Sequence, residues 1–274
     1  MVPLTDTSPE AEEALVSVFR RMSLGQRWLL MGETLRDGRL LHALGVRLRN
    51  PSATARDILE DYLHTQLGLT HLPSISEPAT ERPMQSMHDL REVLRVFTTF
   101  GIPYALGGSM ASSIHGIRRD TLDADITAEP FPGKEAPLSA AFGTDYYLSL
   151  SAIQQAVRQR SSFNIINTST GFKVDVFIRK ELPFEQSAMS RRLTVDLPDA
   201  PGEALVLHTA EDMILFKLRW YRLGQESSKQ QWTDVLGMMK VQADRLDADY
   251  LDRWAADLGV SDLLQRARQE SGVR

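Results

Sequence analysis

The stretch from Ile102 to Ile126 constrains the fold of this chain most, because a strand, a tight turn, a helix and a second strand follow one another there. The residues up to Leu106 form an apolar run typical of a buried strand, and Gly107 and Gly108 come directly after them. A short helix is expected over Met110 to Ile117, and a further strand at the end of the stretch. Strands that alternate with helices over so short a distance indicate an α/β protein.

Two acidic residues stand one position apart in the second of these strands. Residues i and i+2 of a strand point to the same face, so Asp123 and Asp125 project together while the apolar residues between and after them face the core. A hard cation with oxygen ligands relieves their mutual repulsion, and Mg²⁺ suits this role. We therefore predict that the pair binds Mg²⁺, with Mn²⁺ as an alternative ion. A solvated pair of surface acids is the other interpretation of this spacing.

The glycine turn before the helix suits a phosphate group. A helix N-terminus offers backbone N–H groups without partners and the positive end of the helix dipole, and glycines let a ligand approach closely. Gly107, Gly108 and Ser109 are therefore predicted to bind the phosphates of a nucleotide. An ordinary turn remains the alternative for a lone Gly-Gly pair.

A third acidic residue is expected on a hairpin formed by residues 163–167 and 172–178, with its turn near Ser169 to Gly171. In the second strand, residues 172, 174, 176 and 178 are apolar and alternate onto one face, whereas Lys173, Asp175 and Phe177 take the other. A carboxylate in mid-strand is costly on a covered face unless it is paired or binds a metal. Asp175 is therefore predicted as a third metal ligand, and a solvent-facing carboxylate is the alternative.

These residues resemble a known superfamily. The resemblance rests on Tyr104-Ala105-Leu106-Gly107-Gly108-Ser109, on Arg119-x-Thr121-x-Asp123-x-Asp125 and on Val174-Asp175-Val176. They are similar to motifs of the nucleotidyltransferase (polymerase-β-like) superfamily, and within it to the bacterial AbiEii-type group, whose members include toxins of toxin–antitoxin systems. The resemblance implies a mixed sheet with helices, catalytic residues Asp123, Asp125 and Asp175, two Mg²⁺ ions, and a nucleoside triphosphate such as ATP as substrate.

The resemblance extends to a later stretch, Thr209 to Leu218, followed by Trp232-Thr233-Asp234-Val235. It implies that Lys217 lies near the nucleotide phosphates and that Asp234 supports it. Arg119 and Thr121 are further candidates for nucleotide contacts. The helix that carries Lys217 is largely apolar, so a lysine that extends along it to the surface is the alternative. A pair of solvated arginines is the alternative for Arg118 and Arg119.

Four regions are expected along the chain. They are an N-terminal helical segment over 1–70, a proline-containing linker over 71–87, a catalytic core over 88–200 and a helical C-terminal subdomain over 201–274. The N-terminal segment is similar to small helical proteins encoded beside such nucleotidyltransferases. It therefore suits a fused regulator or an antitoxin-like partner, and a simple folding extension is the alternative.

Composition excludes some classes of function. The chain has 274 residues, no cysteine and a net charge of −5, so disulfides and thiolate chemistry are excluded and general coating of nucleic acids is disfavoured. No secretory signal or membrane span is evident, and we expect a cytoplasmic protein that does not bind membranes. The predicted activity is Mg²⁺-dependent transfer of a nucleoside monophosphate to a hydroxyl of tRNA or protein, with a small-molecule acceptor as a further option. The competing class is a non-catalytic protein that binds nucleotides or acts through its helices.

Overall fold

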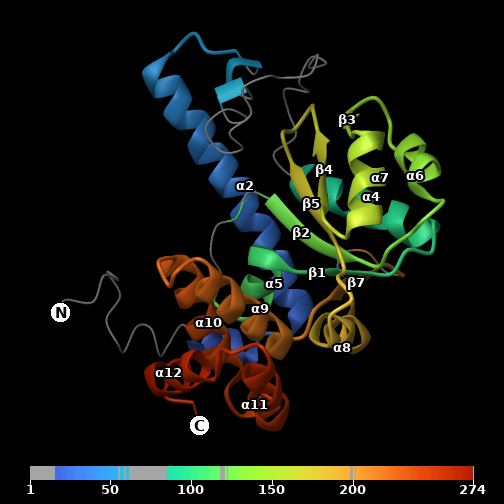
Figure 1. The fold of residues 1–274 in the computed structure, drawn as a ribbon. Coiled ribbons are helices and arrows are strands. Elements are labelled where there is room, and N and C mark those ends of the chain that lie inside the picture. The colour runs from blue at the N-terminus through green and yellow to red at the C-terminus, as the bar shows by residue number, and fades with distance from the viewer. Residues whose placement is uncertain are drawn as a thin grey trace. The chain divides into compact units, whose positions relative to one another are not determined.

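The structure is a computed structural model (Figure 1). It describes residues 16–54, 56–58, 60–61, 85–117, 121, 123–197, 200 and 202–273. The predicted linker over 71–87 lies almost wholly outside the described residues, and so do Arg118 and Arg119. In the N-terminal region, residues 16–21 are helical and helix α2 spans Leu24–Arg49, in agreement with the helical segment expected there.

The chain divides into two compact units, each built from separate segments. The strand unit takes its described residues from 32–107 and 120–189, and the helical unit takes its own from the chain up to Met31, from 108–119 and from 190–274. Helix α2 and helix α8 (Pro183–Arg191) each extend across a boundary between these segments. The four regions expected from the sequence stay predictions.

The strand unit is built on a mixed sheet with the order β3-β4-β5-β2-β1. Its strands are β1 (Tyr104–Leu106), β2 (Asp123–Ala128), β3 (Tyr146–Tyr147), β4 (Ser162–Asn167) and β5 (Lys173–Ile178). The central pair, β2 with β5, is parallel, and the other pairs in this unit are antiparallel. The hairpin of β4 and β5 confirms the sequence prediction, and Gly171 supplies the positive φ of +70° in its turn.

Three helices of the strand unit accompany this sheet, namely α4 (Gln85–Thr99), α6 (Glu135–Ala141) and α7 (Leu150–Gln159). Helix α7 packs on β4 and β5, and α6 packs on both α4 and α7 (Figure 1). Phe131 makes edge-to-face contacts with Phe97 and with Phe163, and Phe97 makes another with Tyr104. Such aromatic contacts add to the burial of apolar area and fix the helices on the sheet.

The helical unit contains α5 (Gly108–His115), the hairpin of β6 (Leu193–Asp196) and β7 (Ala204–Leu207), α9 (Ala210–Leu223), α10 (Lys229–Gln242), the 3₁₀ turn η1 (Ala243–Arg245), α11 (Ala248–Asp257) and α12 (Ser261–Ser271). Two glycines let the end of α5 approach α10. A Cβ on Gly116 would lie 2.8 Å from the backbone nitrogen of Met238, and one on Gly237 would lie 3.4 Å from that of Ile117. The backbones therefore pack directly on one another, which no larger residue at Gly116 allows.

The predicted fold class is confirmed, since the described chain is a mixed α/β protein. Helix α5 lies close to the range expected from the sequence, and α9 is the expected helix that carries Lys217. Strands β3, β6 and β7 and helix α8 were not expected. Among the described residues, each helix is too short or too polar to cross a bilayer.

Candidate active site

The three predicted metal ligands lie on one face of two neighbouring strands of the strand unit. Strands β2 and β5 run parallel with Asp125 opposite Asp175 and Asp123 opposite Lys173. The side chains of all four residues are half-buried, whereas the residues that alternate with them in both strands are buried. The parallel register therefore places all three carboxylates on the same, partly open side of the sheet.

A lysine that the sequence analysis did not assign to the site lies among these carboxylates. Lys173 Nζ is 2.7 Å from Asp175 Oδ2 and 3.9 Å from Asp123 Oδ2. The amide of Asn164, in the orientation that satisfies both its oxygen and its nitrogen, donates to Asp175 Oδ1 over 2.9 Å. The signal for Lys173 was present in the sequence, because its i, i+2 spacing from Asp175 puts both on one strand face.

The donor set of this face fits a hard divalent cation, because carboxylate oxygens are the ligands that Mg²⁺ prefers in proteins. As the side chains stand, no group of three or more His, Asp or Glu residues in the described part of the chain is arranged to hold a metal ion. The ammonium of Lys173 provides the positive charge between Asp123 and Asp175 instead. The carboxylates thus attract positive charge, and Lys173 of β5 provides it.

Two further contacts fix the position of the acidic pair on β2. The hydroxyl of Thr121, which is buried, donates to Asp123 Oδ1 over 3.2 Å. The backbone N–H of Gly107 donates to the backbone carbonyl oxygen of Asp125 over 2.8 Å, so the turn after β1 starts beside the backbone of β2 at this residue. The structure gives Thr121 a contact with Asp123, and the predicted contact of Thr121 with a nucleotide stays a prediction.

The glycine turn has the geometry that a close backbone approach requires. Gly108 has a φ of +55°, a left-handed conformation that strains residues with a side chain, and it begins helix α5. The backbone N–H groups of the first turn of α5 point along the helix axis toward its N-terminal end. The hydroxyl of Ser112 donates to the carbonyl oxygen of Gly108 over 2.7 Å and steadies this first turn. The N–H groups are thus oriented as an anion site would need.

Lys217 and Asp234 form a buried ion pair within the helical unit. Lys217 Nζ lies 2.8 Å from Asp234 Oδ2, and their side chains are only 5% and 4% exposed. Lys217 also donates to Gln231 Oε1 over 3.0 Å. The alternative in which Lys217 extends to the surface is therefore wrong, because the pair joins α9 to α10 inside the unit. Its contact with nucleotide phosphates stays a prediction.

The acidic residues before Lys217 have partners that serve the fold. The hydroxyl of Thr209 accepts a hydrogen bond from the backbone N–H of Asp212 and caps helix α9. Asp212 in turn accepts hydrogen bonds from Thr209 over 2.7 Å and from the Tyr250 hydroxyl over 2.6 Å. Burial raises the pKa of the Asp212 carboxyl above its usual range. This part of the motif therefore ties α9 to α11.

Comparisons with known proteins give weak similarities. No family model matches the chain, and no curated protein matches it. The crystal structure of ANT(2″)-Ia in complex with adenylyl-2″-tobramycin aligns at 13% identity and a TM-score of 0.39, over 62% of this chain and 95% of that chain. An antigenic nucleotidyltransferase-like protein from Paracoccidioides brasiliensis aligns at 16% identity and a TM-score of 0.43, over 71% and 95% of the respective chains. TM-scores this low assign neither a family nor an activity to this chain.

Proposed function

We propose that this chain is a Mg²⁺-dependent nucleotidyltransferase that moves a nucleoside monophosphate from a nucleoside triphosphate to a hydroxyl acceptor and releases pyrophosphate. One observation carries the proposal. Asp123, Asp125 and Asp175 share one face of two parallel strands, with Asp125 and Asp175 directly opposite each other. The glycine turn that follows β1 begins with an N–H bonded to the backbone of Asp125.

The carboxylates of Asp123, Asp125 and Asp175 would hold the metal. When bound, divalent ions at such a site neutralise phosphate charge and make a hydroxyl a better nucleophile at the α-phosphorus. The chain itself contributes orientation. Thr121 holds the carboxylate of Asp123 and Asn164 holds that of Asp175, so neither side chain must be ordered at the moment of reaction.

Lys173 is the group that must change partner in this proposal. Its ammonium neutralises Asp175 and Asp123 in the resting arrangement and so lowers the cost of placing carboxylates side by side. A divalent ion at the same carboxylates competes with that ammonium. Once released from Asp175, Lys173 carries a positive charge suited to a phosphate oxygen of the triphosphate.

The triphosphate would lie against the turn formed by Gly107, Gly108 and Ser109. The positive φ of Gly108 and the N-terminal end of α5 at this turn support this placement. Lys217 and Arg119 are proposed as further phosphate contacts on the resemblance to the superfamily alone.

The resemblance to AbiEii-type toxins supports a tRNA or protein hydroxyl as acceptor. It also supports an antitoxin-like partner, or a regulator fused as the N-terminal helical segment. A small molecule is the remaining acceptor class.

The direct test incubates the purified chain with each α-³²P-labelled nucleoside triphosphate, Mg²⁺ and a cell extract, and then separates RNA, protein and small molecules. Label is expected in one of these fractions. Asp125→Asn should lower its rate by at least about two orders of magnitude, because a metal-bound carboxylate is lost. Asp145→Asn removes an exposed carboxylate in the same unit and serves as the matched control. Full activity of the Asp125 variant would refute the proposal.

One observation favours a second candidate, a non-catalytic nucleotide-binding protein. The ion pair of Lys173 with Asp175 gives this carboxylate a positive partner without any metal. Calorimetry with a non-hydrolysable triphosphate distinguishes the two. The enzyme requires Mg²⁺ or Mn²⁺ for tight binding, whereas the binding protein gives the same affinity in EDTA and transfers no label.

A further inference from the structure

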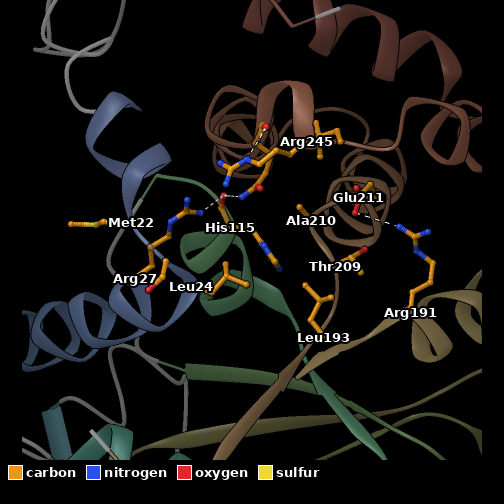
Figure 2. A pocket seen from close by; sticks show the side chains of 13 residues that line it. Met22, Leu24, Arg27, His115, Arg191, Leu193, Thr209, Ala210, Glu211 and Arg245 are labelled. Carbon is orange, nitrogen blue, oxygen red and sulfur yellow. Dashed lines mark hydrogen bonds and ion pairs between the residues drawn. The ribbon is translucent and has the colours of Figure 1, made fainter. Parts of the chain in front are cut away.

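The helical unit contains a pocket that the proposed transfer does not use. Its volume is about 380 Å³, which lies at the lower end of the range for small-molecule sites. Figure 2 shows that its lining comes from the chain around Met22 and Arg27, from the end of α5 at His115, from Arg191, and from Arg245 after α10. Segments far apart in the sequence therefore build one partly open pocket.

The charges that line the pocket are predominantly positive. Three guanidinium groups and one carboxylate reach it, namely those of Arg27, Arg191, Arg245 and Glu211. Arg191 already has acidic partners, since it lies 3.5 Å from Glu211 and 3.9 Å from the carboxylates of both Asp212 and Asp247. The positive charge available to a ligand therefore comes from Arg27 and Arg245.

Arg27 is a buried cation held by backbone oxygens. Only 2% of the residue is exposed, and it donates to the carbonyl oxygens of Phe19, Ile114 and His115 over 2.6 to 3.1 Å. Within the described residues its Nε has no hydrogen-bond partner, and no carboxylate lies within ion-pair distance of its guanidinium. Burial and the nearby charge of Arg245 lower its pKa to about 10. A buried charge without a counter-ion is costly, and an anion in the pocket would offset that cost.

Arg245 makes the same kind of contacts at the mouth of the pocket. Its Nη2 donates to the carbonyl oxygen of Val241 over 2.8 Å, and its Nε donates to that of Gln242 over 3.4 Å. In the described chain Arg245, like Arg27, is bonded to carbonyl oxygens alone. Its exposed side chain leaves other N–H groups of the guanidinium available to a ligand.

The remaining polar groups of the pocket can orient a bound anion but do not carry a full positive charge. His115 is fully buried and its Nε2 donates to the carbonyl oxygen of His208 over 2.7 Å. Burial lowers the pKa of His115 to about 4, so its ring is neutral at physiological pH. The first turn of α9, at Thr209 and Ala210, also lines the pocket and adds the positive end of a helix dipole.

We propose that this pocket binds a small organic anion, a phosphate monoester or a carboxylate, through Arg245 and the positive field of Arg27. The anion is a ligand separate from the triphosphate of the proposed transfer. Guanidinium groups recognise both kinds of oxyanion, so the two sources share one chemistry.

Thermal unfolding and calorimetry of the full chain test this proposal with ribose 5-phosphate, citrate, inorganic phosphate and uncharged ribose as probes. At a concentration a hundredfold above Kd, a binding anion should raise Tm by roughly 5 to 10 °C. Binding of ribose 5-phosphate but not citrate identifies the phosphate class, and the reverse identifies the carboxylate class. Ribose should have no effect.

The variant Arg245→Gln should weaken anion binding about tenfold or more, because one charge-assisted hydrogen bond is lost. Its contacts in the chain are local, so the fold is expected to persist even where Arg27→Gln unfolds the unit. Arg158→Gln removes an exposed arginine from α7 and is the matched control. Equal affinity in wild type and Arg245→Gln, or no Tm change with any anion, would overturn the proposal.

Discussion

Loss of the lysine from the buried pair of Lys217 and Asp234 should destabilise the chain strongly. In Lys217→Met the ammonium is lost and Asp234, whose side chain is 4% exposed, keeps a charge without its partner. Breaking a buried pair in this way costs about 3–5 kcal/mol. For a chain of this size the loss corresponds to a fall in Tm of roughly 6–20 °C.

The double variant Lys217→Met/Asp234→Leu separates the cost of a lone charge from the worth of the pair. Apolar side chains of similar size replace both charges, and such replacements are often neutral or stabilising. We expect its unfolding free energy to lie within about 1 kcal/mol of wild type, which gives a coupling energy of at least about 2 kcal/mol. Urea denaturation, followed by tryptophan fluorescence and by circular dichroism, measures the unfolding free energies of wild type, the two single variants and the double variant, which together form a double-mutant cycle.

An exposed pair provides the control for this cycle. Arg56 and Glu60 are 2.9 Å apart with side chains 58% and 40% exposed, so Arg56→Met should cost less than about 1 kcal/mol. If Lys217→Met unfolds at the same urea concentration as wild type, or if the double variant is as unstable as the single one, then a lone buried charge on Asp234 does not destabilise the unit as reasoned. A stable double variant would also allow a labelling assay to ask whether the transfer requires Lys217.

Three further predictions concern pH, packing and metal binding. Burial lowers the pKa of His115 from 6.5 to about 4, so its neutral ring contributes about 3 kcal/mol to the unfolding free energy above pH 6.5, and this contribution is lost as the pH falls toward 4. Urea midpoints across this range should show the loss in wild type and not in His115→Gln. Gly116→Ala should cost about 1–3 kcal/mol, because its Cβ would meet the nitrogen of Met238 at 2.8 Å, whereas Gly143→Ala, with no atom within 4 Å, should leave Tm unchanged or raised. Lys173→Met should bind Mn²⁺ at least about tenfold more tightly than wild type without nucleotide, as measured by electron paramagnetic resonance, since the competing ammonium is gone; equal affinity would contradict that competition.

Local periodicity accounts for the parts of the fold that the sequence predicted correctly. The alternation of apolar residues in β5 and the turn at Gly171 predicted the hairpin with β4, because both signals lie within a few residues of each other. The strands β6 and β7 were missed. Each has only four residues, too few for an alternation of apolar and polar residues to stand out from chance.

The candidate site was predictable as a set of residue types and not as a set of contacts. The spacing of Asp123 and Asp125 placed both on one face, but the register that sets Asp125 opposite Asp175 joins strands fifty residues apart. The contact of Lys217 could not be predicted from the sequence for the same reason. Its partner lies on α10, and no local pattern reveals how α9 packs on that helix.

The division of the chain into segments has a consequence for the order in which it folds during synthesis. The chain passes between the two units four times, at residues 31–32, 107–108, 119–120 and 189–190. Every residue of the strand unit has been synthesised by position 189, whereas the helical unit must wait for the segment that begins at Ser190. On a ribosome, helix α5 and the buried Arg27 therefore remain without α9 and α10 until the chain has been synthesised past Gln242.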